Sequence, residues 1–182
     1  MISTPFRFML KNSMRAAAAA AVLLLAACSP EYNWRELDVA DGRVRAAFPA
    51  RVQTETRELA LGGQSLQFSL TAAQVNRAVY AVGYAPLPPG VAGDAAASQD
   101  LARALVQSLH ANLGRDAPEA MPSYGHDIEV HGEAVNGGPP SWLLARVWVA
   151  DGMLIEAVAA GAEDRLDGDK AREFIDGVRV HQ

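Results

Sequence analysis

Six side chains have the types and positions that a binding site would need. Residues 141–159 are predicted to form a β-hairpin around Asp151-Gly152, with apolar side chains on both faces. Arg146 falls on one face and Glu156 on the other, and a buried charge needs a partner or water. Either both charges reach the sheet edge or a core partner, or they line a cleft that binds a ligand or peptide. A register shift of one residue would instead pair Arg146 with Glu156. The aromatic residues that could complete the cleft are Tyr80, Tyr84, Trp142 and Trp148.

The histidine and acidic residues do not form a recognisable metal site. His126 and His131 are five positions apart on a predicted strand, so their side chains point to opposite faces, and His110 lies on a predicted helix. The acidic residues within 163–169 lack the spacing of a calcium-binding loop and fit a helix N-terminus, which favours negative charge. We therefore expect no metal and no cofactor.

The chain contains none of the sequence motifs typical of nucleophilic or phosphate chemistry. It has no G-x-S-x-G, no H-E-x-x-H and no glycine-rich phosphate loop. Its glycine pairs, Gly62-Gly63 and Gly137-Gly138, fit tight turns. We expect no catalytic residue and therefore a protein that is not an enzyme. The alternative is a periplasmic hydrolase or lipid-modifying enzyme with an unrecognised site.

The first 27 residues have the composition of an export signal. Residues 1–15 carry three basic residues and no acidic one, and twelve apolar residues follow, Ala16 to Ala27. A helix that spans a bilayer needs about 20 apolar residues, so this run is too short. We predict a signal peptide over residues 1–27 and no membrane-spanning helix in the rest of the chain.

The end of this run resembles the lipobox of bacterial lipoproteins, since Leu25-Ala26-Ala27-Cys28 places an aliphatic and two small residues before a cysteine. In that class a diacylglyceryl group modifies the cysteine sulfur and cleavage precedes the cysteine. Cys28 is the single cysteine of the chain, and lipid modification explains why an exported protein has no partner for it. An ordinary signal peptide with an incidental cysteine is the alternative.

The lipobox resemblance implies how the rest of the chain is organised. Two or three acyl chains on Cys28 would anchor the protein stably in a membrane. Residues 28–33 would form a lipidated tether and residues 34–182 a single periplasmic domain. In Gram-negative lipoproteins a serine after the cysteine, here Ser29, permits transfer outward. We therefore expect the periplasmic face of the outer membrane rather than the inner membrane.

Composition excludes a nucleic-acid partner. Of 182 residues, 16 are basic and 21 acidic, and the leader holds three of the basic ones and none of the acidic ones. The chain that remains after residue 27 has 155 residues and a formal charge of −8. Binding to a polyphosphate backbone requires clustered Lys and Arg, which this balance does not favour.

Turn residues and period-two alternation predict several antiparallel hairpins. Turns at Asp41-Gly42, Gly62-Gly63 and Asn76-Arg77 connect the first strands, which have one apolar face each. The first turn places Asp38 directly across from Arg45. Pro49 ends the strand that follows this turn.

Two helices are predicted among the strands. Leucines every four residues indicate a long helix from about Ser98 to Leu113, with Ser98 as N-cap and Gly114 as the C-terminal stop. A strand is expected over about 127–135. A short helix is expected over about Gly168–Asp176, followed by a tail. The overall prediction is α+β, an antiparallel sheet packed with one long and one short helix.

This order of elements resembles the PsbP/Mog1-like α/β/α sandwich family. The resemblance is carried by the hairpin that closes at Phe48-Pro49, the strand that ends at Tyr84-Ala85-Pro86 before the long helix, and the final Phe174-Ile175-Asp176 helix. Another α+β fold, such as a cystatin-like one, is the alternative. The family consists mostly of non-catalytic assembly or partner-binding proteins. The resemblance therefore implies an envelope lipoprotein that binds a protein or a small ligand close to the membrane.

Overall fold

The computed structural model describes residues 31–133 and 137–181. From Tyr32 onward the described chain forms one compact unit. None of the described helices is long and apolar enough to span a membrane. The predicted signal peptide and Cys28 lie outside the described residues.

Two antiparallel sheets form most of this unit. A large sheet has the strand order β3-β4-β5-β8-β7-β6, and a small one has the order β1-β2-β9. All described strand pairs are antiparallel, as predicted. The strands are β1 (Arg35–Val39), β2 (Val44–Phe48), β3 (Val52–Leu61), β4 (Gln64–Val75), β5 (Ala78–Pro86), β6 (Ile128–Glu133), β7 (Pro140–Ala150), β8 (Met153–Ala162) and β9 (Arg179–Val180).

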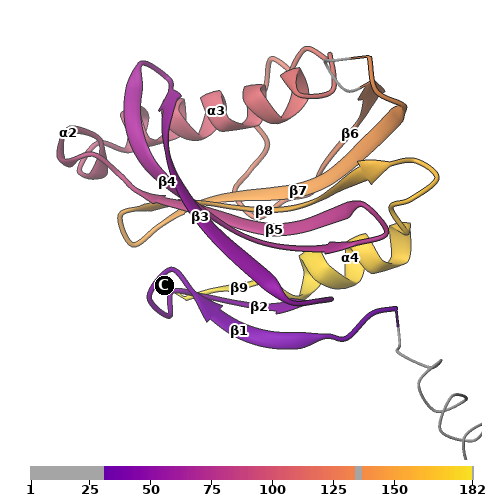
Figure 1. Ribbon diagram of the computed structural model, residues 1–182. Coiled ribbons are helices and arrows are strands. Elements are labelled where there is room, and N and C mark those ends of the chain that lie inside the picture. The colour runs from indigo at the N-terminus through magenta and orange to yellow at the C-terminus, as the bar shows by residue number, and fades with distance from the viewer. Residues whose placement is uncertain (1–30, 134–136, 182) are drawn as a thin grey trace, which may run out of the picture. The chain divides into compact units, whose positions relative to one another are not determined.

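The helices lie on both sides of the large sheet. Helix α3 (Ala95–Ala111) runs along one face, and α4 (Gly168–Gly177) lies at the other face together with the small sheet (Figure 1). A short helix, α2 (Pro89–Ala92), precedes α3. The protein is therefore α+β, with the large sheet as the middle of three layers.

The turns follow the backbone chemistry of the sequence. Gly62-Gly63 and Asn76-Arg77 both have positive φ at their two residues, the geometry that suits a two-residue hairpin. In the first hairpin Asp38 pairs with Arg45 as predicted, with 2.7 Å between Asp38 Oδ1 and Arg45 Nε.

The central strands are buried on both faces, as the sequence predicted. Alternate residues of β7 and β8 enter two separate hydrophobic cores, one under α4 and the small sheet and one under α3. Strand β4 corrects the expectation that the early hairpins have one apolar face. Its Leu66 and Phe68 enter the α3 core, whereas Ala73 and Val75 enter the α4 core.

Both ends of the long helix differ from the prediction: α3 begins at Ala95 rather than Ser98, and it ends at Ala111 with Asn112 as C-cap rather than at Leu113 before Gly114. The N-cap of α3 is Asp94, whose Oδ1 accepts hydrogen bonds from the backbone N–H groups of Ala96 and Ala97, at 2.9 and 3.0 Å. The prediction of Ser98 as N-cap was wrong because an aspartate one turn earlier takes that role. The Ser98 hydroxyl donates instead to the carbonyl of Val91.

The C-terminal tail forms a strand that the sequence did not predict. Strand β9 pairs with β2, with Val180 opposite Val44. Strand β6 ends at Glu133, and residues 134–136, where the expected strand continued to 135, lie outside the described residues. Helix α4 matches its prediction to within one residue and buries Ala171, Phe174 and Ile175.

Candidate functional site

Arg146 connects three segments on the α4 side of the sheet. Its Nε contacts Asp127 Oδ1 at 2.5 Å and its Nη2 contacts Asp176 Oδ1 at 2.6 Å. Its Nη1 donates to the carbonyl of Ile175 at 3.4 Å, near the C-terminal end of α4, where a cation is favourable. Burial opposes the charged form, but the bonds to the two aspartates raise the pKa of Arg146 above its ordinary value.

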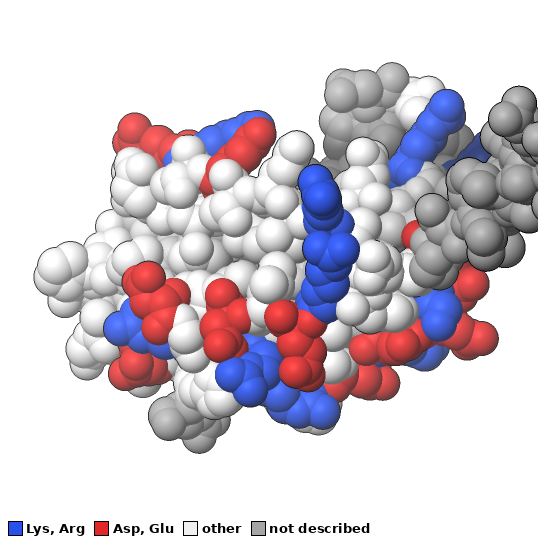
Figure 2. All heavy atoms as spheres, turned by 60° about the horizontal axis from the view of Figure 1, so that its bottom comes forward, with Lys and Arg blue, Asp and Glu red and all other residues white. Residues whose placement is uncertain are grey.

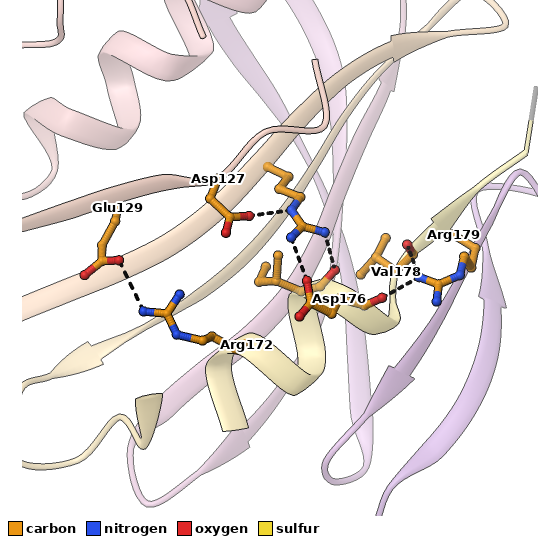
Figure 3. A network of polar contacts seen from close by, with 8 residues as sticks. Asp127, Glu129, Arg172, Asp176, Val178 and Arg179 are labelled. Atoms are coloured by element: carbon orange, nitrogen blue, oxygen red, sulfur yellow. Dashed lines mark hydrogen bonds and ion pairs between the residues drawn. The ribbon is translucent and has the colours of Figure 1, made fainter. Parts of the chain in front are cut away.

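The surrounding polar contacts extend this network along α4 (Figure 3). Arg172 lies 3.6 Å from Glu129, between Nη2 and Oε2. Arg179 donates to the carbonyl oxygens of Asp176 and Val178. These contacts join β6, β7, α4 and β9, so the geometry gives Arg146 a structural role in this layer.

The predicted aromatic residues share the α4 side but pack into its core. Tyr80 is fully buried, in edge contact with Phe174 at 5.6 Å between ring centroids. Trp142 is buried and stacks on His131 at 5.6 Å. Tyr84 and Trp148 are half-buried against the same core.

Glu156 lies on the opposite face, in the α3 core. The register pairs Val147 with Glu156 and Arg146 with Ala157, so the two charges do not form an ion pair across the hairpin. The structure therefore brings Tyr80, Tyr84, Trp142, Arg146 and Trp148 to one side of the sheet and leaves Glu156 on the other.

Glu156 is a buried carboxyl group with 7% of its surface exposed. Its Oε2 makes no hydrogen bond with any described residue, and desolvation raises its pKa to about 7. Gly83 lies opposite it on β5, and a Cβ there would come within 2.7 Å of Glu156 Oε1 and 2.6 Å of the Phe68 ring. Because glycine has no Cβ, Gly83 leaves room for the side chains of Glu156 and Phe68.

His131 is held between two carboxylates on the edge strand β6. Its Nε2 lies 3.0 Å from Glu129 Oε1 and its Nδ1 lies 3.3 Å from Glu163 Oε1, and these hydrogen bonds raise the pKa of His131. The Nε of Arg115 donates to the His131 carbonyl at 2.7 Å. A cavity of about 570 Å³ adjoins these residues. Within residues 31–133 and 137–181, no three His, Cys, Asp or Glu residues are placed to hold a metal ion.

Three further cavities follow one another across the large sheet, and we call them together the sheet groove. The first, about 230 Å³, lies over Leu59, Phe68 and Leu70. The second, about 480 Å³, shares Leu70 with the first, and the third, about 590 Å³, shares Val79 with the second. Leu59, Leu70 and Ala160 pack against the α3 core, so the floor of the groove faces the α3 side of the sheet, while Trp142 of the α4 core also lines the third cavity.

The floor of the sheet groove is apolar and partly open to solvent. Val79 pairs with Gln74 of β4 on one side and with Ala160 of β8 on the other, so the floor crosses three strands. Its half-buried apolar residues are Leu70, Ala72, Val79 and Ala160.

Charge is mixed on the surface of the molecule. On the face shown in Figure 2, acidic and basic side chains lie next to one another, and large areas carry neither. Among the described residues, this face has no continuous basic surface of the kind that binds a polyphosphate backbone.

The described chain begins with an aromatic cluster at the N-terminus of the domain. Tyr32 and Trp34 stack with 6.1 Å between ring centroids, and Trp34 meets Tyr80 edge-on at 6.4 Å. Lys170 Nζ of α4 lies over both rings, at 5.7 and 5.9 Å from their centroids. The chain is therefore fixed to the domain from Tyr32, four positions after Cys28.

Sequence reasoning missed the two carboxylates beside His131 and the sheet groove. Glu129 and Glu163 are 34 positions apart, and the hairpin β7–β8 brings them together, so local spacing carries no signal for this pairing. The groove residues follow the period-two pattern of ordinary strands. Their exposure depends on how far α3 extends over the sheet.

Comparisons of the chain with protein-family models, with curated proteins and with solved structures find no match.

Proposed function

We propose that this protein is a bacterial lipoprotein, anchored through lipid on Cys28, whose domain binds a ligand or a partner without catalysis. The observation that carries the proposal is the leader, in which a basic start, twelve apolar residues and Leu25-Ala26-Ala27-Cys28 follow in order. Ser29 favours the periplasmic face of the outer membrane.

The start of the folded domain supports this arrangement. Tyr32 and Trp34 already pack against the domain, so residues 29–31 alone separate it from Cys28. An extended chain spans at most about 3.6 Å per residue, so this tether places Tyr32 within roughly 15 Å of the anchor. A domain held in this way samples ligands and partners at the membrane surface.

The positions of the ionisable groups favour binding over hydrolysis. A general base must lie within hydrogen-bond reach of its substrate. Glu156, which titrates near neutrality, lines none of the four cavities described above. His131, although it adjoins one of them, already has both ring nitrogens in contact with carboxylates.

We also propose that the domain has the PsbP/Mog1-like fold. The three-layer arrangement supports this assignment, with α3 on one face of an antiparallel sheet and α4 on the other. The last helix follows the β7–β8 hairpin, as the resemblance implies, and its Phe174 and Ile175 lie in the core.

Metabolic labelling tests the anchor. The full-length protein is expressed in a Gram-negative host with radiolabelled palmitate, beside the variant Cys28→Ala. We expect label on the native protein and none on the variant, which also keeps its leader and migrates as the longer species. Equal label on both proteins, or no label on either, would contradict the proposal.

Membrane fractionation tests the location. Sucrose-gradient separation is expected to place the native protein with the outer membrane. The variant Ser29→Asp is expected to move to the inner membrane, since aspartate at that position commonly retains lipoproteins there. If the native protein and the variant both fractionate with the inner membrane, the assignment to the outer membrane is wrong.

A further inference from the structure

Two arginines line the sheet groove at the end of the sheet where β3 begins and β4 turns into β5, and we call this side of the groove its basic end. Arg51 lines its second cavity and Arg77 lines its third, and both side chains are exposed. Arg51 directly precedes β3, and Arg77 lies in the turn between β4 and β5, so the two lie at the same end of the sheet. Neither arginine forms an ion pair within the described part of the chain.

Two of the three acidic residues that line the groove are in ion pairs, and the third, Glu58, lies in the first cavity. Glu55 forms an ion pair with Arg57, and Asp164 forms one with Arg165 at 3.2 Å. Glu58 accepts a hydrogen bond from Ser65. Within the described residues, the second and third cavities therefore present two arginines outside ion pairs, although the chain after residue 27 is strongly acidic.

An apolar floor beside two exposed arginines favours a ligand that is apolar along its length and carries a negative charge at one end. Leu70, Ala72, Val79 and Ala160 offer an apolar track across β4, β5 and β8. The second and third cavities each have the volume of a small-molecule site. Each methylene that leaves water on such a floor favours binding. A carboxylate or phosphate at the basic end would pair with a guanidinium.

We propose that the sheet groove binds a single-chain anionic amphiphile, with its acyl chain along the floor and its anionic head between Arg51 and Arg77. This inference gives a chemical class to the ligand of the proposed binding domain. It rests on that proposed function but not on the lipid anchor. A cationic amphiphile is disfavoured because it would meet the two unpaired arginines.

Photolabelling tests the groove in the full-length protein, held in nanodiscs of zwitterionic phosphatidylcholine. The probes are dodecanoate and dodecylammonium, each with a diazirine at the chain end. Labelled peptides are identified by mass spectrometry, and the dependence of label on probe concentration gives an apparent Kd. We expect dodecanoate to label residues 70–79 saturably and in competition with unlabelled dodecanoate, and dodecylammonium to label them much less.

Three variants show which features carry the binding. Arg51→Glu with Arg77→Glu is expected to raise the apparent Kd of dodecanoate roughly tenfold or more, because charge-assisted hydrogen bonds are lost. Ala72→Phe is expected to block the floor while both arginines remain. Arg35→Glu with Arg103→Glu makes the same charge change at exposed positions outside the groove and is expected to leave the Kd unchanged.

Label spread evenly over the surface, equal labelling by the two probes, or an unchanged Kd in the Arg51/Arg77 variant would each overturn the proposal. Failure of the anchor is seen separately as loss of palmitate at Cys28. A protein that labels in the groove but carries no palmitate would retain this inference and lose the lipoprotein assignment.

Discussion

Replacing Glu156 by glutamine is expected to stabilise the protein above pH 7 and to change little below pH 5. The carboxyl is buried in the α3 core, and desolvation raises its pKa from 4.5 to about 7. Between these two values the folded protein binds a proton that the unfolded chain has released. The free energy of unfolding therefore falls as pH rises from 4.5 through 7, and the loss is complete above 7.

The magnitude follows from the pKa difference. Each pKa unit corresponds to 1.36 kcal/mol, so the charged carboxylate costs the folded state about 3 kcal/mol at pH 8. Glutamine has nearly the same shape and carries no charge at any pH, so the variant lacks this loss. We expect Glu156→Gln to exceed the native protein in free energy of unfolding by about 3 kcal/mol at pH 8 and by a few tenths at pH 4.5.

Urea unfolding at several pH values between 4.5 and 8.5 measures this difference. Glu119→Gln is the matched control, because Glu119 is exposed, and its difference from the native protein is expected to stay near zero throughout. A Glu156→Gln difference that is independent of pH, or that grows toward low pH, would refute the reasoning that burial alone controls this carboxyl.

Three further predictions concern the contacts that hold the layers together. Arg146→Met is expected to lower the free energy of unfolding by about 2 kcal/mol, because Asp127 and Asp176 lose their partly buried partner. Thermal unfolding measures this loss, and the melting temperature of Arg146→Met is expected to lie below that of a surface arginine variant. An unchanged melting temperature would contradict the structural role of Arg146. Asp94→Ala removes the N-cap of α3 and is expected to lower the free energy of unfolding, measured in urea, by about 1 kcal/mol. A larger loss of stability in Ser98→Ala would show that Ser98, and not Asp94, caps the helix. By NMR titration, the pKa of His131 is expected to lie above 6.5 in the native protein and to fall in Glu129→Gln. Because this pKa is raised in the folded state, the ion pairs of His131 stabilise the fold at low pH, and this stabilisation is lost as pH rises through the raised pKa. An unshifted pKa in the native protein would contradict the carboxylate contacts.

The sequence predicted the local features of the fold well because they depend on turn chemistry and side-chain period. The pairing of Asp38 with Arg45 follows directly from a turn at Asp41-Gly42. The two-sided burial of β7 and β8 follows from apolar residues at successive positions. Helix α4 follows from Ala171, Phe174 and Ile175 on one helical face.

Features that depend on distant segments were not predictable in the same way. Strand β9 has two residues, and its partner β2 lies more than 130 positions away. Asp127 and Asp176 contact Arg146 because β6 and α4 both pack beside β7, and no local sequence pattern predicts these contacts. The space that the Glu156 side chain occupies depends on Gly83, a residue of another strand.

The candidate site shows the same division. The alternation of side chains along a strand correctly placed Arg146 and Glu156 on opposite faces of the hairpin. This placement argues against a single cleft that contains both side chains. The sheet groove depends on which part of the sheet α3 leaves uncovered. That is a property of the packed layers, and the alternation of Leu70, Ala72 and Gln74 is shared with any half-exposed strand.

The small sheet has a consequence for the order in which this protein can fold. It joins β1 and β2, which open the domain, to β9, which closes it. A chain that leaves a ribosome or a translocation pore N-terminus first cannot complete this layer until residues 179–180 have emerged. Contacts between distant ends of a chain form late because loop closure costs entropy. The core that contains Phe48 and Phe174 is thus completed only after α4 and β9 have emerged, and a chain interrupted before them lacks one side of this core.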